Sequence, residues 1–480
     1  MKLVYGVSDK PAWGKTLVFA LQQLLAIMAA TITVPLLVNQ ATGAAMSTSA
    51  ALFGAGVGTL VYLLFTKFKS PVFLGSSFAF IPSLIAAFSG AASASVGYLG
   101  IIIGAILAGL VYVILALIVK KFGTNWINKL MPAVIIGPTV AIIGLSLSGA
   151  AIQQVFNYAP NNGNGFVMST NTWMCVLVAL VALAVTIACS VFGKKMVKMI
   201  PFIIGIGAGY VLALIITGIG YGASNDALKL IDFGAFTNAG WGKFVGGWLP
   251  DFTFIKAFGS FGDGANFVNF GAYFGTITLA FVPVAFVVFA EHIADHKNLS
   301  TIVEQDLLTE PGLHRTLLGD GVGSMAGAFF GGCPNTTYGE SIGCVAISGN
   351  ASVRTICVTA IMAIVLSFIL PFTVLLASIP QCVMGGICIA LYGFIAVSGL
   401  KMIQKVDLND NKNLFVVSVI LICGAGGFAI NIVFNAGQLI FTDIACALIL
   451  GILTNLLVNI KKGKVVATIG PKAKQDKEEK

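Results

Sequence analysis

Residues 333–349 read Cys-Pro-Asn-Thr-Thr-Tyr-Gly-Glu-Ser-Ile-Gly-Cys-Val-Ala-Ile-Ser-Gly, a short apolar segment that Pro334, Gly339 and Gly343 interrupt. Glu340 stands inside it. An ionisable group at bilayer depth costs about 2.5–3.5 kcal/mol even on lenient insertion scales, so it usually lies on a substrate or ion pathway. The stretch therefore predicts an interrupted membrane span that takes part in function.

The rest of the composition fits a membrane. The chain has 480 residues, of which 58% are hydrophobic and 9% charged, and its mean hydropathy is +0.97. Soluble globular proteins carry about 25% charged residues. We therefore expect an all-α polytopic membrane protein. The motifs of metalloproteases, serine hydrolases and P-loop enzymes stand in no credible context, so an enzyme is the least expected class. The nine cysteines are interpreted as packing residues, with neither a disulfide framework nor a metal site expected.

Apolar stretches of membrane-spanning length predict fourteen spans, fewer residues being needed where a span is broken. They are expected at 16–38, 46–66, 72–89, 97–119, 130–149, 173–193, 199–219, 272–295, 316–332, 335–349, 354–378, 382–400, 414–434 and 439–460. Lysine and arginine gather in every second connection, which places those connections and both termini in the cytoplasm. The basic tail at 461–480 lacks interleaved aromatic residues, so it predicts contact with anionic lipid rather than nucleic acid.

Fourteen spans divide into seven plus seven, and an odd number in each half inverts the second half relative to the first. Two local similarities support this division. The sequence Gly-Ala-Gly-Val-Gly-Thr at 54–59 resembles Gly-Asp-Gly-Val-Gly-Ser at 319–324, and Ser-Ser-Phe-Ala at 76–79 resembles Thr-Thr-Tyr-Gly at 336–339. The third and tenth spans are also the most interrupted. They predict short extended strands followed by half-helices, whose free backbone N–H groups would line a binding cavity.

A second carboxylate, Glu291, lies in the apolar stretch 281–296, and Asp295 follows it by one helical turn on the same face. Two carboxylates this close in an apolar site do not both ionise easily, which is what a proton-coupled carrier requires. The alternative for Asp295 is a local hydrogen-bonding role at the end of its helix. Asp320 is expected at a helix end or in a pair rather than in proton coupling.

These side chains together suit one kind of ligand. The carboxylates of Glu291 and Glu340 accept hydrogen bonds from N–H donors, backbone N–H groups donate to carbonyls, and the rings of Phe78 and Tyr338 pack on flat molecules. Such a set describes a small planar heterocycle such as a nucleobase. An inorganic anion would call for basic residues, and neither broken segment contains one.

At these motifs the chain resembles the nucleobase–ascorbate transporter (nucleobase:cation symporter-2) family, most closely its bacterial uracil-carrying branch. The resemblance runs from Gly-Val-Ser-Asp-Lys-Pro at 6–11 to the last predicted span. It is densest at 75–80, 290–293, 306–315, 334–340 and 384–386. It implies a core domain built from 14–122 (spans 1–4) and 272–378 (spans 8–11). It also implies a gate domain built from 127–220 (spans 5–7) and 382–460 (spans 12–14), followed by the basic cytoplasmic tail 461–480.

The resemblance implies that Glu291 and Glu340 bind the base, that the aromatic residue of the third span is Phe78, and that the tenth span contributes Tyr338 and Gly339. The chain departs from the family pattern at four positions. Ser341 and Ser348 replace an asparagine and a threonine, Asp295 replaces a histidine of some uracil carriers, and Gln23 replaces a histidine of the first span. These departures bear on the proton route more than on the substrate class.

We therefore expect a proton-coupled importer of uracil in a bacterial cytoplasmic membrane. Glu291 and Asp295 would couple the proton, and no cofactor or metal is expected. The expected partners are the base and the lipid bilayer; a homodimer is left open and nucleic acid is not expected. The alternatives are a xanthine or urate permease of the same family, an anion transporter on the same fold, and a channel or receptor. An anion transporter should prefer arginine or serine at position 340, where this chain has glutamate.

Overall fold

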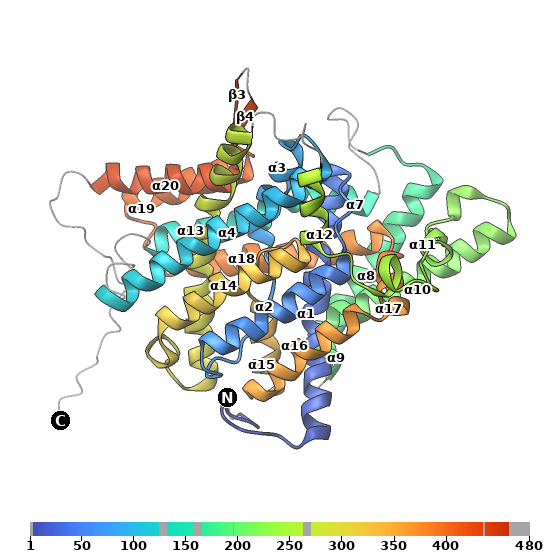
Figure 1. The fold of residues 1–480 in the computed structure, drawn as a ribbon, viewed down its shortest axis with the longest axis horizontal. Helices are drawn as coiled ribbons and strands as arrows, with labels where there is room; N and C mark the ends of the chain where they lie inside the picture. The colour runs from blue at the N-terminus through green and yellow to red at the C-terminus, as the bar shows by residue number, and fades with distance from the viewer. Residues whose placement is uncertain are drawn as a thin grey trace.

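The computed structural model describes residues 3–123, 132–156, 166–194, 196–262, 270–434 and 437–459. These residues form a helical protein with two small two-stranded sheets (Figure 1). The predicted tail at 461–480 and the first residues of the predicted gate part at 127–220 lie outside the described residues.

The first half of the chain runs from α1 to α10. Its elements are α1 (Trp13–Thr42), α2 (Thr48–Phe65), β1 (Leu74–Ser76), η1 (Phe78–Phe80), α3 (Ile81–Ser89), α4 (Ala94–Phe122), α6 (Ala133–Ser146), α7 (Ser148–Phe156), α8 (Thr170–Phe192), α9 (Met196–Met199) and α10 (Pro201–Gly222). Serine side chains begin several of these helices. The hydroxyls of Ser47, Ser93 and Ser169 accept first-turn N–H groups of α2, α4 and α8, which satisfies donors that have no partner inside a helix.

A long connection leads to the second half. It contains η2 (Asp226–Leu228), α11 (Gly234–Thr237), η3 (Phe244–Trp248), α12 (Thr253–Phe258) and η4 (Gly259–Gly262). The second half contains α13 (Phe270–Val303), η5 (Leu308–Gly312), α14 (Leu313–Gly331), β2 (Asn335–Thr337), α15 (Gly339–Ser348), α16 (Val353–Ser367), α17 (Leu370–Ala377), α18 (Gln381–Ile403), α19 (Asn411–Ala425), β3 (Ile430–Phe434), β4 (Gly437–Phe441) and α20 (Asp443–Asn459).

Among the described residues, eight helical segments are long and apolar enough to cross a membrane. They become nine if α16 and α17, which meet at 83°, count as one bent span. The other predicted spans correspond to β1 with η1 and α3, to α14, to β2 with α15, and to the shorter helices α19 and α20. The chain is thus a multi-pass membrane protein.

The helices pack in two sets. In the first, α14 lies against α2 and α4, α16 against α1 and α2, and α13 against α4. In the second, α18 lies against α6, α7 and α8, α19 against α6 and α20, and α10 against α8. Figure 1 shows α19 and α20 at one edge of the molecule and α8 and α10 toward the other.

Glycines let α2 and α14 approach closely. A Cβ atom added at Gly54 would lie 2.5 Å from the carbonyl oxygen of Gly327, and one added at Gly58 would lie 2.7 Å from that of Gly323. Helices in membranes use small residues in this way because close backbone approach maximises packing. The two similar glycine-rich sequences found at 54–59 and 319–324 therefore belong to one helix–helix contact between the halves.

The structure also differs from the predicted spans around residues 426–441. The thirteenth span was expected at 414–434, but α19 ends at Ala425, where Gly426 and Gly427 follow and Gly427 has a φ of +68°. Beyond it β3 and β4 pair antiparallel, with Ile430 opposite Phe441. A short apolar run does not by itself distinguish strand from helix, and the Ile-Asn-Ile-Val-Phe sequence of β3 is rich in residues that favour strands.

Candidate functional site

The two interrupted segments meet as a small antiparallel sheet. β1 pairs with β2, with Leu74 opposite Thr337 and Ser76 opposite Asn335. The amide of Ser77 extends the pairing by donating to the carbonyl of Pro334 over 2.9 Å. Each strand leads directly into a helical piece, η1 and α3 on one side and α15 on the other. The extended strands predicted in the third and tenth spans are present and pair across the two halves.

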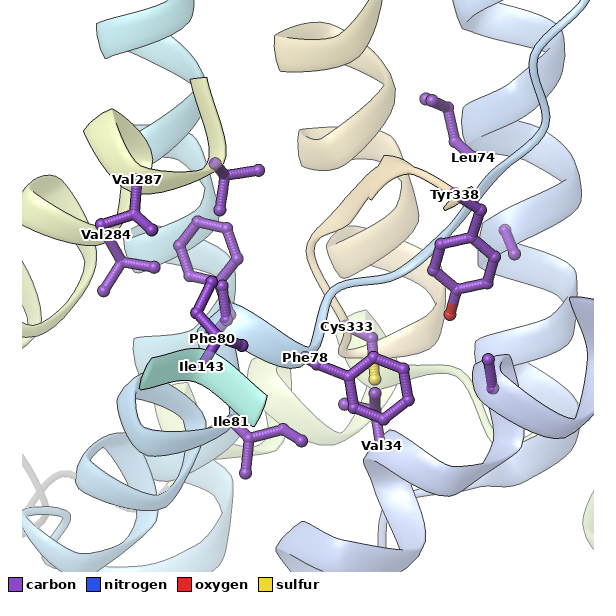
Figure 2. Packing of buried hydrophobic residues seen from close by; sticks show 14 of the residues in the cluster. Val34, Leu74, Phe78, Phe80, Ile81, Ile143, Val284, Val287, Cys333 and Tyr338 are labelled. Carbon is purple, nitrogen blue, oxygen red and sulfur yellow. The ribbon is translucent and has the colours of Figure 1, made fainter. Parts of the chain in front are cut away.

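Tyr338 ties the two strands together. Its hydroxyl donates to the carbonyl of Ser76 over 2.7 Å, and a Cβ atom added at Gly75 would lie 2.3 Å from its ring. Figure 2 shows the Tyr338 ring beside the strand that carries Leu74. The ring is 3% exposed, so the part of Tyr338 that can reach a ligand is its backbone.

The beginning of α15 presents backbone and a carboxylate together. Tyr338 is the N-cap and Glu340 lies in the first turn. First-turn N–H groups have no partner inside a helix, and the helix dipole is positive there. Gly339 is exposed, while Glu340 is half-buried. This end of α15 thus offers donors and an acceptor within one turn.

Phe78 forms an aromatic wall. It is 6% exposed and contacts Tyr392 of α18 edge-on, with 5.7 Å between ring centroids. Figure 2 shows Phe78 projecting from the segment that follows β1. Because Tyr392 belongs to the second helix set, Phe78 lies where the two sets meet.

Helix α13 supplies the other two acidic residues. Glu291 and Asp295 lie one turn apart and both are half-buried. The hydroxyl of Thr337 donates to Asp295 over 2.7 Å, which links α13 to β2. In the part of the chain that the structure describes, the Glu291 carboxylate has no hydrogen-bond partner and faces a cavity.

The cavity has a volume of about 380 Å³ and brings together every predicted site residue: Phe78, Glu291, Asp295, Tyr338, Gly339 and Glu340 all line it. Binding pockets for small molecules span about 300–1,000 Å³. The second helix set contributes Val140, Ile143, Phe202, Phe394, Ile395, Ser398 and Met402. The cavity thus lies between the two helix sets.

Several polar residues of the cavity escaped the sequence analysis. Asn298 lies two turns beyond Glu291 on α13, and Ser190, Lys198 and Ser398 also line the cavity. The spacing of Glu291, Asp295 and Asn298 follows one helix face, a signal that could have identified Asn298. The serines and Lys198 come from distant helices, and only the tertiary structure brings them here.

Behind Glu291 lies a fully buried polar network. His292 contacts Asp320 over 2.7 Å and Thr316 over 3.0 Å, and His296 contacts the Tyr62 hydroxyl over 2.8 Å. His292 and His296 are 0% exposed and Asp320 is 1% exposed. The network joins α13 to α14 and α2. It thereby fixes the position of α13, whose neighbouring face carries the two acidic residues. Asp320 therefore lies in a pair, as the sequence indicated.

Two of the departures from the family pattern contact each other. The Gln23 side-chain amide donates to the Ser341 hydroxyl over 2.6 Å and to its carbonyl over 3.2 Å. The same hydroxyl accepts the Phe73 amide over 3.2 Å. Gln23 and Ser341 therefore join α1, α15 and the segment before β1, directly beside Glu340.

Comparisons with known proteins identify the family of the chain. A family model described as "Permease family" matches residues 14–433. A uracil permease of Bacillus caldolyticus is 39% identical over 95% of this chain and 95% of its own length. A uracil permease of Escherichia coli K12 is 34% identical over 95% and 94%, and a putative pyrimidine permease of the same organism is 29% identical over 96% and 95%.

Solved structures with the same fold have much lower sequence identity. The transmembrane domain of a cyanobacterium bicarbonate transporter superposes with a TM-score of 0.59 at 16% identity, covering 94% of this chain and 100% of that one. A murine Solute Carrier 26 family member A9 anion transporter gives 0.60 at 12% identity, covering 94% and 69%. These similarities establish a transporter fold and say nothing further about the cargo.

Proposed function

Because the chain belongs to the nucleobase–ascorbate transporter (nucleobase:cation symporter-2) family, we propose that it imports uracil across the bacterial cytoplasmic membrane by proton symport. It is a transporter and not an enzyme. One observation carries the proposal. Glu291 of α13 and Glu340 of α15, both from the second half of the chain, line one cavity with the exposed backbone of Gly339 and with the ring of Phe78 from the first half.

The two N–H groups, one carbonyl and the ring face of uracil each have a counterpart in this cavity. Glu340 and Glu291 accept the two ring N–H groups, and the backbone N–H groups at Tyr338 and Gly339 donate to a ring carbonyl. Phe78 packs against the ring. Hydrogen bonds to charged groups contribute about 1.5–3 kcal/mol each, so the two glutamates supply most of the specificity for a ligand with N–H donors.

Proton coupling rests on Glu291 and Asp295. Their separation of one turn on α13 favours sharing of a proton, since two neighbouring anions repel in a poorly solvated site. The hydroxyl of Thr337 in β2 donates to Asp295 in α13. Substrate binding beside β2 and protonation of α13 are therefore connected through this hydrogen bond. A proton moving inward gains about 2.3 kcal/mol per 100 mV of membrane potential.

The architecture we propose has fourteen membrane segments in a 7+7 inverted repeat with both termini in the cytoplasm. The pairing of β1 with β2 and of α2 with α14 supports it, since each pair joins corresponding elements of the two halves. The first helix set corresponds to a core domain (14–122 and 272–378), and the second to a gate domain (127–220 and 382–460). A site between them suits alternating access by movement of one against the other.

The fold is shared with anion transporters, but the cavity chemistry argues against an anion here. Glu291, Asp295 and Glu340 line it, against one cationic side chain, Lys198. Acidic groups around a bound anion would repel it at every pH at which they are ionised.

The proposal is tested with purified protein in detergent and in proteoliposomes. Calorimetry against uracil, thymine, xanthine, urate and ascorbate should give the tightest binding for uracil. Proteoliposomes with an acidic exterior should then accumulate labelled uracil. Preference for xanthine or urate would assign the chain to purine transport, and accumulation without a proton gradient would refute symport.

A further inference from the structure

The motif at residues 6–11 is not explained by the cavity, yet the structure gives it definite contacts. Residues 4–9, here called the N-terminal strap, lie along the connection between α15 and α16. The amides of Val4 and Tyr5 both donate to the carbonyl of Gly349, over 2.8 and 3.1 Å. In return the amide of Ala351 donates to the carbonyl of Tyr5 over 2.9 Å.

The pairing continues to the end of the strap. The amide of Val353 donates to the carbonyl of Val7 over 3.1 Å, and the hydroxyl of Ser352 donates to the carbonyl of Asp9 over 2.6 Å. Asp9 also closes the turn of the motif by accepting the Gly6 amide over 2.8 Å. The glycine and aspartate of the motif therefore shape the strap that the connection binds.

The strap covers backbone that would otherwise be left without partners. Residues 350–353 are at most 4% exposed, and two of their N–H groups donate to the strap. A buried donor without a partner costs about 1–3 kcal/mol. Removing the strap therefore leaves a connection that must rearrange.

The connection is the far end of α15, whose first turn carries Glu340. The helix has ten residues, which corresponds to about 15 Å. Gly343, Cys344 and Ile347 line the cavity, while Ile342 and Val345 are buried and the helix packs against α1 and α13. The position of α15 is fixed further at its two ends, by β2 and Gln23 at one end and by the strap at the other.

We propose that the N-terminal strap positions Glu340, by fixing the far end of α15 and thereby its distance from Glu291. The strap touches neither the cavity nor the substrate, so its residues are positioning residues. The inference rests on the proposed function in one respect: uracil binding is the measurement that detects a change in the position of Glu340.

Two substitutions loosen the strap without deleting it. Tyr5→Pro removes one N–H group that bonds to Gly349, together with the ring that contacts Phe19, and leaves the carbonyl that serves Ala351 in place. Ser352→Ala removes the bond to Asp9, and Ser352→Thr keeps a hydroxyl at that position. Misplacement of a binding group by about 1 Å costs up to about 100-fold. We expect Tyr5→Pro and Ser352→Ala to weaken uracil binding about fivefold or more, and Ser352→Thr to restore it.

Matched controls separate positioning from general destabilisation. Ser8→Ala alters an exposed side chain in the same strap and should leave the Kd unchanged. Thr217→Ala removes a hydroxyl in α10 that accepts the amides of Leu230 and Ile231. It should lower the melting temperature without changing the Kd.

Calorimetry on the full chain in detergent gives the Kd, and thermal unfolding of the ligand-free protein gives the stability of each variant. A wild-type Kd in both Tyr5→Pro and Ser352→Ala overturns the proposal, as does a Kd in Thr217→Ala raised to the same extent. If Tyr5→Pro fails to fold, the pair Ser352→Ala and Ser352→Thr decides alone. Failure of the wild-type protein to bind uracil would instead refute the proposed function.

Discussion

At the scale of residues, the acidic side chains that line the cavity differ in their hydrogen-bond partners. Glu340 stands at a helix N-terminus beside exposed backbone, while Glu291 has no protein partner among the described residues and Asp295 has Thr337. A ligand therefore meets two carboxylates, those of Glu340 and Glu291, that are open to it, and a third, that of Asp295, that is already bonded to Thr337. This difference predicts separable effects on binding and on coupling.

Replacing either glutamate should weaken uracil binding strongly. Glu291→Ala and Glu340→Ala each remove a charged acceptor, a loss of about 1.5–3 kcal/mol, which corresponds to about 10- to 100-fold weaker uracil binding. Uptake of labelled uracil by cells should fall to background while the amount of protein in the membrane fraction stays constant. Wild-type uptake in either variant would refute the site assignment.

Asp295→Asn should act on coupling. The amide retains a partner for Thr337 but cannot carry a proton, so uracil binding measured by calorimetry should change by less than about threefold. Accumulation driven by a pH gradient in proteoliposomes should be lost, while exchange of internal for external uracil continues. Normal accumulation by this variant would assign the proton to another group.

One ion pair outside the membrane segments predicts a pH effect with a definite sign. Lys69 pairs with Glu310 and holds the pKa of that exposed carboxyl below its usual value. A depressed pKa means that the stabilisation is present at neutral pH and is lost as the pH falls through the folded-state pKa. Lys69→Met should therefore lower the melting temperature slightly at pH 7, and the difference should vanish in acid. The effect is small because both side chains are solvated.

At the scale of elements, the antiparallel pairing of β1 with β2 determines the geometry of the site. The sheet includes the hydrogen bond from Tyr338 to Ser76, and β2 leads into α15. It also contains Thr337, which donates to Asp295. Gly75 is essential to it, because any side chain there would enter the Tyr338 ring.

Gly75→Ala should therefore damage both stability and binding. The added Cβ would lie 2.3 Å from the ring, and overpacking of this kind costs about 1–3 kcal/mol. Thermal unfolding should show a lower melting temperature and calorimetry a weaker affinity for uracil. The matched control is Gly207→Ala on α10, where a Cβ meets nothing within 4 Å. Equal behaviour of the two variants would contradict the packing argument.

The sequence revealed these elements because their composition is unusual. Proline and glycine inside short apolar spans indicated the broken segments, and buried acids indicated Glu291 and Glu340. It could not reveal the part of the cavity wall that the second helix set contributes, since Ser190, Ser398 and Phe394 look like ordinary helix residues until the helices pack. It also misjudged residues 426–441, where apolar strand and apolar helix have the same composition.

At the scale of the whole molecule, the cavity lies where the two helix sets face each other, with Phe78 of one against Tyr392 of the other. Movement of one set relative to the other would change that contact and the access to the acids together. Transport then depends on the energy that drives the movement, which we assign to the proton gradient.

A protonophore should accordingly stop accumulation of uracil without preventing its binding. Cells or proteoliposomes should lose a preformed uracil gradient within minutes of its addition, while the Kd of the purified protein stays the same. Retention of the gradient would exclude proton symport and favour another coupling ion.

The pairing of Gly75 with Thr336 also has a consequence for synthesis of the chain. The partner of β1 is made 261 residues later, which at about 5–20 residues per second takes about 13–52 s. Throughout that time the backbone of β1 lacks the strand that satisfies it, and lipid offers no substitute. The backbone of β1 must therefore be solvated by water or covered by protein at the insertion machinery during that time. The binding site forms only after the second half has been synthesised.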